Sequence, residues 1–482
     1  MQQHAVMVTA AVLGFCGVTR AWLMGPMWLD QSFIPLQYAD RLARGFGFKL
    51  AGQFGPIEGF TNPIWVALFG GLGGLNVHEA EIQAAVGLLL YGWLIVFCVR
   101  QIWSLHGRWI SLLPVGLLGL APVVAAVRDG SDTVWLALWS VVAAVGVTAE
   151  SEGERSRHTP PLALFVLSVS GLFGMVISLG LALIAAPVHR WRCLRVVFSG
   201  ILCVVVLRWA IFGTWASPVF IGPENGLEAL WLMPIFVAMG WLGILFGRPQ
   251  WRRTMALAWV LVVGTGFAAW TGQTTHGFGA ALIPVMGAVT LLASNVLAAH
   301  RSVLWGLVLI GAAVMVDVRQ TEAKLPDVAH ARMSDFLQSR GMGRFLLWRF
   351  EPDDRVVVHK PGAVPYYSRR PVVDLSGRLH GHPVTPDAAL AHDPVAVLPD
   401  RKLVSRKAQR LAMQSDWPDR LEKRYNQYAI QHQKAWQMVD VNPVWFHIYI
   451  RRDLPMLRAE IPQSNGNILP RADPFGPQQV NP

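Results

Sequence analysis

Long apolar stretches recur through residues 1–318 and constrain the fold more than any other feature of the chain. A helix that crosses a bilayer needs about 20 apolar residues. Only 15% of the 482 residues are charged, whereas soluble domains carry about 25%. The sequence therefore predicts a polytopic α-helical membrane protein. The apolar runs fall near residues 5–25, 82–99, 110–127, 133–149, 162–188, 196–212, 229–247, 254–271, 280–299 and 302–318.

The arginines in the short loops predict the topology. Residues 63–75 are too short to cross comfortably and are expected to form a re-entrant or surface helix. If 162–188 is a broken pair of half-helices, about eleven crossings place the arginine-rich loops on one side, which is cytoplasmic by the positive-inside rule. The N-terminus then lies in the cytoplasm, and the first loop and the tail lie outside the inner (plasma) membrane. A single tilted span at 162–188 is the alternative.

The composition divides the chain into a membrane part and a tail. We expect a transmembrane domain over 1–318, whose outer first loop is 29–62, and a small soluble α/β domain over 319–461. The segment 462–482 is rich in Pro, Asn, Gln and Gly, which is typical of disorder. The net charge of +11 comes from scattered basic residues. Beside a membrane these favour lipids or an anionic polymer as partners rather than nucleic acid.

Local patterns predict the elements of the tail. Alternating and β-branched residues favour strands, and apolar positions at helical spacing favour helices. We expect helices at 324–340, 402–413 and 421–433, and strands at 355–359, 363–367, 371–375 and 445–450.

Acidic residues stand at the edges of the apolar segments in two outer loops. Asp30 precedes an amphipathic helical pattern, Glu58 follows a glycine-rich turn, and Asp132 precedes an apolar run. Capping of a helix is the simplest explanation for Asp30 and Asp132, and Ser131 and Thr133 compete for the second cap. The functional explanation is a general base or a cation ligand at the mouth of a membrane cavity.

Five segments carry a more specific pattern: DQSFIPLQYA (30–39), EGFTNPIW (58–65), GSDT (130–133), GAVPYYS (362–368) and RPVVDLSG (370–377). Together they resemble a group of GT-C-type glycosyltransferases that includes the terminal arabinofuranosyltransferase and the flagellar motor control proteins. The resemblance covers about residues 30–380. It implies a GT-C-like fold that transfers a sugar on the outer membrane face, with inversion, from a polyprenyl-phosphate donor to an envelope glycan or lipid acceptor.

The resemblance also implies roles for individual residues. Asp30 becomes the candidate catalytic base, and Asp132 a supporting or metal-side carboxylate, so that a divalent cation is compatible with the site. The implied substrate-binding residues are Gln31, Glu58, Thr61 and Asn62, which shape the cavity, and Arg41, Arg44 and Arg128, which face the lipid phosphate. For the three arginines, a charged side chain that extends to the membrane surface is an equally good explanation.

The chain departs from the pattern of that group at several charged positions. Gln31 replaces the second acid of the usual pair, and Gln37 replaces the usual arginine. At 177–180, where the group has a charged motif at its broken helix, the chain reads ISLG. These losses favour either a changed substrate or a catalytically inactive protein with a GT-C fold that acts as a cell-envelope assembly or regulatory factor.

Overall fold

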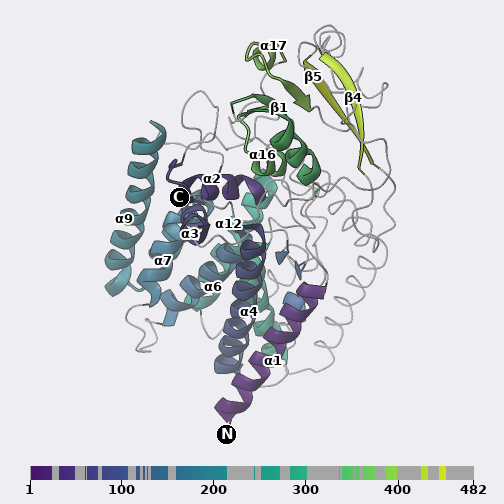
Figure 1. Ribbon diagram of the computed structural model, residues 1–482. Coiled ribbons are helices and arrows are strands. Elements are labelled where there is room, and N and C mark those ends of the chain that lie inside the picture. The colour runs from purple at the N-terminus through teal and green to yellow at the C-terminus, as the bar shows by residue number, and fades with distance from the viewer. Residues whose placement is uncertain are drawn as a thin grey trace, which may run out of the picture.

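The computed structural model places a helical domain beside a small α/β domain, and the start of α1 and the sheet lie at opposite ends of the molecule (Figure 1). The sheet is thus separated from the start of α1 by the length of the helices. The structure describes residues 2–23, 32–48, 60, 62–73, 79–106, 116–119, 123–124, 127–128, 132–149, 159–213, 244, 251–271, 283–300, 336, 339–351, 353–358, 362–375, 386–398, 425–432 and 444–451.

The helical domain is built from apolar helices that pack around one central helix, α6. Helix α6 contacts α4, α7, α8, α12 and α13, while α1 packs on α4 and α9 packs on α7. The helices are α1 (Gln2–Leu23), α2 (Phe33–Ala43), α3 (Pro63–Gly73), α4 (Glu79–His106), α6 (Thr133–Ala149), α7 (Thr159–Val169), α8 (Leu172–Ile184), α9 (Pro187–Phe212), α12 (Trp251–Thr271) and α13 (Ile283–His300).

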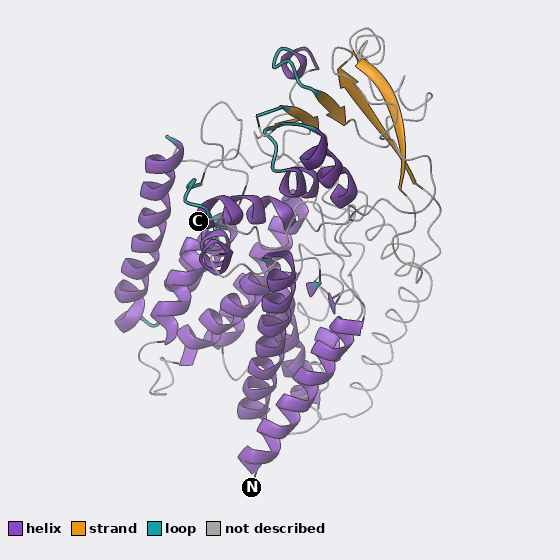
Figure 2. Ribbon diagram, in the orientation of Figure 1, coloured by secondary structure: helices purple, strands orange, loops and turns teal. Residues whose placement is uncertain are grey.

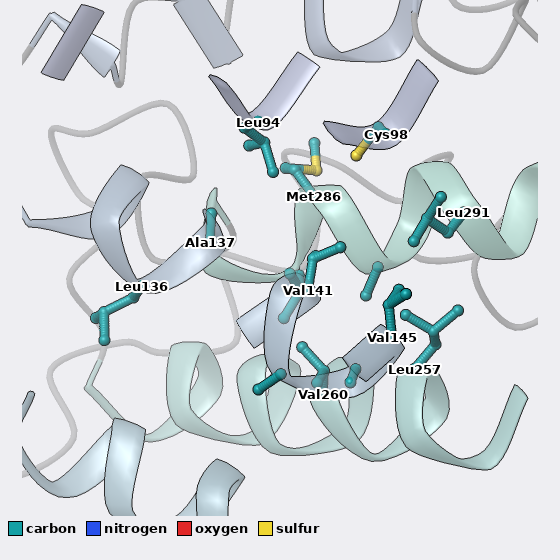
Figure 3. Close-up of a cluster of buried hydrophobic side chains, with 14 of the residues drawn as sticks. Leu94, Cys98, Leu136, Ala137, Val141, Val145, Leu257, Val260, Met286 and Leu291 are labelled. Carbon is teal, nitrogen blue, oxygen red and sulfur yellow. The ribbon is translucent and has the colours of Figure 1, made fainter. Parts of the chain in front are cut away.

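The main hydrophobic core surrounds α6 (Figure 3). Val141 of α6 is fully buried, and Gly287 of α13 faces it so closely that an added Cβ would come within 2.4 Å of the valine side chain. Small residues at such crossings let helix backbones approach, which is how apolar helices associate where water supplies no driving force. The core is therefore of the kind expected inside a membrane domain.

The apolar segment 162–188 forms two helices, as the broken-pair prediction required. Helix α7 ends at Val169 and α8 begins at Leu172. Gly171 joins them with φ +95° and ψ −178°, a backbone conformation that is essentially restricted to glycine. The break thus lies at Ser170–Gly171 and not in the ISLG segment at 177–180, which is part of α8. Helix α9 then begins with Pro187 at its first turn, where proline is favoured.

Three of the described helical segments are long and apolar enough to cross a bilayer: His4–Leu23, Ile82–His106 and Pro187–Phe212. Shorter apolar helices accompany them, among them α3, whose 11 residues agree with the expectation that 63–75 is too short to cross; its re-entrant or surface position stays a prediction. Several predicted spans, such as 229–247 and 302–318, lie outside the described residues. The count of about eleven crossings stays a prediction.

The tail forms a five-stranded mixed sheet in the order β2-β1-β3-β5-β4 (Figure 2). The strand β1 pairs in parallel with β2 and β3, and β5 pairs antiparallel with β3 and β4. The predicted strands at 355–359, 371–375 and 445–450 are confirmed. The strands are β1 (Val356–Val358), β2 (Val372–Asp374), β3 (Ala396–Leu398), β4 (Tyr425–His432) and β5 (Val444–Arg451), with short helices α16 (Ala363–Ser368) and α17 (Pro386–Leu390).

Two predicted tail elements are wrong. Residues 363–367 were expected as a strand but belong to helix α16, because parallel strands β1 and β2 need a crossover between them. Residues 421–433 were expected as a helix but contain β4, since antiparallel pairing with β5 decides the conformation over local preference. The helix expected at 324–340 appears at 339–349, with a helical position at Phe336. The expected helix at 402–413 lies outside the described residues.

Replacement of Gly171 by alanine should destabilise the protein by about 1–3 kcal/mol, the cost of forcing a side chain into a glycine-only conformation. Gly71 is the matched control: it lies within α3 and an added Cβ would meet open space, so Gly71→Ala should be neutral or stabilise by about 0.5–1 kcal/mol. Unfolding of the detergent-solubilised variants measures both. Equal stability of the Gly171→Ala and wild-type proteins would contradict the observed break.

Candidate functional site

The first-loop helix α2 is confirmed, with bounds Phe33–Ala43. Its N-cap residue is Ser32, which makes no side-chain capping hydrogen bond. Asp30 itself lies outside the described residues, so capping and catalysis both stay open as explanations for it. Most of the helix is buried, including Phe33, Leu36 and Tyr38, because α3 packs along it and α16 covers its start. The helix is thus enclosed by protein rather than lying freely in the membrane interface.

An aromatic junction joins α2 to the tail domain. Phe33 stacks on Phe336 at a ring-centroid distance of 5.6 Å and contacts Tyr366 and Tyr367 at 5.5 and 5.8 Å. The Gln37 side chain donates a buried hydrogen bond from Nε2 to the Gly362 carbonyl at 2.8 Å. In the resemblance Gln37 stands for a lost arginine, but here it has a structural role. The first-loop motif at 30–39 and the tail motif at 362–368 thus meet at this helix.

Asn62 and Asp132 lie together at the starts of α3 and α6. Asn62 is 3% exposed, and its Oδ1 accepts a hydrogen bond from the Trp65 backbone N–H at 3.2 Å, which caps α3. The Asp132 carbonyl accepts the first helical hydrogen bond of α6, from the Leu136 N–H at 3.1 Å. The Asn62 side-chain amide faces the Asp132 carboxyl. Two segments singled out in the sequence, 58–65 and 130–133, therefore converge.

The electrostatics of Asp132 combine opposing effects. Burial raises the pKa of the Asp132 carboxyl above its ordinary value, while the Asn62 amide and the Asp132 backbone N–H lower it by favouring the charged form. Burial is the larger effect. Asn62 Nδ2 is buried and makes no hydrogen bond of normal geometry among the described residues. Asp132 is thus a half-buried acid with a raised pKa, a property that candidate catalytic groups share.

A row of tryptophans fixes the two helix starts relative to the helix break. Trp65 and Trp135 contact each other at 6.1 Å, and Trp135 donates from Nε1 to Ser170 Oγ at 3.0 Å. Ser170 directly precedes Gly171, whose positive φ forms the break. The starts of α3 and α6 and the α7–α8 break therefore form one connected region. Trp135 and Ser170 were not among the candidate residues of the sequence, because helical spacing alone does not show which side chains meet.

The three arginines predicted to face a phosphate differ in their surroundings. Arg44 is exposed and forms an ion pair with Asp40 at 2.7 Å. Arg41 lies over the Phe46 ring at 5.2 Å, and burial lowers its pKa. Arg128 is 6% exposed, and its guanidinium lies over the Trp22 ring at 5.6 Å. Burial lowers its pKa as well. Arg128 is thus the most enclosed of these cations, and it lies four residues from Asp132 in the sequence.

The remaining predicted residues Asp30, Gln31, Glu58 and Thr61 lie outside the described residues, so their roles stay predictions. Within the described part of the chain no three His, Cys, Asp or Glu side chains come close enough to hold a metal ion. Among the described residues, Asp132 is the acidic side chain at the starts of α3 and α6 that could bind a cation. A divalent cation would need Asp30 or Glu58 beside it.

Gln37→Leu should destabilise the protein by about 0.5–1.5 kcal/mol, because the buried bond from Gln37 Nε2 to the Gly362 carbonyl is lost while that carbonyl keeps the Tyr366 N–H as a donor. Asp40→Asn, one turn away on the exposed side of α2, removes only an exposed ion pair and should cost no more than about 0.5 kcal/mol. Unfolding in detergent compares the two variants. Indistinguishable stabilities would mean that the junction between α2 and the tail does not stabilise the fold.

Arg128→Gln and Arg44→Gln should separate a buried cation from an interfacial one. The Arg128 variant loses a cation–π contact between a buried guanidinium and an exposed ring, worth about 1–2 kcal/mol, whereas Arg44→Gln loses an exposed helix ion pair of about 0.3–0.5 kcal/mol. The same unfolding experiment at low and high salt provides the check, since only the exposed pair is strongly screened. A larger loss for Arg44→Gln would reverse this ranking.

Comparison by sequence finds similarity in the tail alone. A family model described as a domain of unknown function (DUF8728) matches residues 327–454, a range that contains all five strands of the sheet. No curated protein matches the chain.

Comparison by structure finds a similarity that extends over almost the whole chain. The crystal structure of ArnT from Cupriavidus metallidurans bound to undecaprenyl phosphate superimposes with a TM-score of 0.54 and 14% sequence identity. The match covers 93% of this chain and 97% of ArnT. The predicted GT-C-like membrane fold is therefore confirmed, while the narrower resemblance to the arabinofuranosyltransferase and flagellar motor control group stays a prediction.

Proposed function

We propose that the protein is a membrane glycosyltransferase that moves a sugar from a polyprenyl-phosphate donor to an envelope glycan or lipid on the outer face of the inner membrane. The observation that carries the proposal is the convergence of Asn62 and Asp132 at the starts of α3 and α6. Both belong to segments for which the sequence implied a site, and they meet inside a GT-C-like fold.

The fold supports a polyprenyl phosphate as the lipid partner. ArnT was crystallised bound to undecaprenyl phosphate, and this chain shares its fold over 93% of the length. A donor of that kind reaches its site sideways from the bilayer, so the donor site must open at the membrane edge. The first loop and the half-buried Asp132 stand at the ends of apolar helices, where such a headgroup would lie.

The proposed reaction is a single inverting displacement. Asp30 as carboxylate accepts the proton of an acceptor hydroxyl while that oxygen forms a bond to the anomeric carbon. The bond from the anomeric carbon to the phosphate oxygen breaks with its electron pair, and polyprenyl phosphate leaves. Asp132 supports the site from the second loop, and Glu58 and Thr61 shape the cavity. A nearby cation favours the leaving phosphate, and Arg128 is the buried candidate.

A second function is favoured by one observation. Gln37, at the position where the resembling group has an arginine, is committed to a buried hydrogen bond with the tail. Together with Gln31 in place of a second acid, this indicates that some catalytic charges have been exchanged for structural groups. The alternative is a catalytically inactive GT-C-fold protein that assembles or regulates the cell envelope, since a fold does not by itself imply a function.

Complementation of a deletion strain tests the enzyme proposal. Asp30→Asn removes the base while keeping size and shape, so it should fail to restore the sugar that the deletion loses from the envelope. Mass spectrometry of envelope glycans measures the sugar, and immunoblotting of membranes confirms equal abundance. Asp40→Asn is the matched control: it changes an acid on the same loop that is already paired with Arg44, and it should restore the sugar fully.

The outcomes separate the two functions. Loss of the sugar with Asp30→Asn and its return with Asp40→Asn would make Asp30 part of the reaction. Full restoration by Asp30→Asn, with an envelope defect still present in the deletion strain, would favour the inactive assembly or regulatory factor.

A further inference from the structure

The Asn62 side chain does more than cap a helix. Its Oδ1 already satisfies the Trp65 N–H, which is all that a capping residue has to do. Serine or aspartate would cap α3 as well, and neither carries a nitrogen donor. The Nδ2 group is buried, lacks a hydrogen bond of normal geometry among the described residues, and faces Asp132. A buried donor left unmatched costs about 1–3 kcal/mol, so its presence calls for an explanation beyond the cap.

The orientation of the amide is fixed by its surroundings. Because the Trp65 N–H requires an acceptor, the oxygen of Asn62 must face α3 and the nitrogen must face away from it. Trp65 follows Asn62 by three residues, and Trp135 follows Asp132 by three residues. The contact of these two rings at 6.1 Å therefore keeps the two helix starts side by side. The bond from Trp135 to Ser170 holds the pair against the α7–α8 break.

We propose that Asn62 is a positioning residue for Asp132. Its Nδ2 restrains the carboxyl of Asp132 so that the charged group faces the substrate at a fixed angle. The inference deepens the proposed function and rests on it. A charge-assisted hydrogen bond of this type contributes more than a neutral one, and it tightens when a ligand closes the site. Asn62 thereby couples the first loop to the second loop without touching the reacting atoms.

Asn62→Ser separates positioning from capping, because the hydroxyl keeps an acceptor for the Trp65 N–H but removes Nδ2. In the complementation assay we expect sugar transfer to fall at least about tenfold, corresponding to about 1.4 kcal/mol, at unchanged membrane abundance and melting temperature. Asn62→Asp also keeps the cap but places a second carboxylate against Asp132, and it should lose more. Asn295→Ser makes the same change on α13, away from the pair, and should transfer normally.

Combination with Asp132→Asn gives the decisive comparison. If Asn62 acts through Asp132, the Asn62→Ser/Asp132→Asn double variant transfers no less sugar than Asp132→Asn alone. Independent, multiplying losses would overturn the proposal, as would wild-type transfer by Asn62→Ser. Envelope glycans that do not change on deletion of the protein would instead overturn the proposed function, and this inference with it. Sugar lost on deletion but restored by Asn62→Ser would overturn the inference alone.

Discussion

The packing of α2 between the helical domain and the tail is the interaction on which the arrangement of the outer side depends. Phe33 is 1% exposed and contacts three aromatic rings, of which one belongs to the helical position at Phe336 and two to α16. Aromatic contacts of this kind add about 0.5–1.5 kcal/mol each beyond the burial of apolar surface. The close approach of α3 to the other side of α2, at Gly70 and Leu42, completes the enclosure. The first loop is therefore held from both sides.

Because this region is enclosed, its polar side chains are removed from water and need hydrogen-bond partners within the protein. Away from water, a polar side chain needs a partner or it destabilises the fold. Gln37 donates a hydrogen bond to the Gly362 carbonyl, and Trp135 donates one to Ser170. Asn62 accepts one from the Trp65 N–H at the start of α3. Asp132 is different, since burial raises its pKa more than its neighbours lower it. Burial disfavours the charged form of this carboxyl, and a buried acid of this kind is the strongest sign of function in the described part of the site.

The charged positions at which the chain departs from the resembling group can now be compared with the contacts in the structure. The amide of Gln37 sits where the resembling group has an arginine, and it secures the tail instead of meeting a substrate. Asp132 and Asn62 still face each other, so the connection between the first and second loops persists. The break between α7 and α8 lies at Ser170 and Gly171, and the segment 177–180, where the group has its charged motif, is helical within α8. A changed substrate and a lost activity both fit this exchange, and they differ in whether Asp30 is needed.

Much of the architecture could be predicted because its causes are local. The apolar lengths predicted the membrane class, the amphipathic spacing after Asp30 predicted a helix in the first loop, and β-branched or alternating runs predicted β1, β2 and β5. The bend between α7 and α8 was predicted from the excess length of 162–188, but its place depended on which glycine adopts a positive φ. Asp132 and Asn62 were named as candidates from motif segments alone.

What only the tertiary structure decided was which of these residues meet. Residues 363–367 are helical because a crossover joins the parallel strands β1 and β2, and 421–433 contain a strand because this segment pairs with β5. The local spacing of residues predicts neither contact. Gln37 lies 325 residues from its partner Gly362, and Asn62 and Asp132 meet across two loops. The local pattern of a sequence indicates whether a segment forms a helix or a strand and whether it faces lipid or water. Contacts between distant segments depend on how whole elements pack, and these contacts made the site.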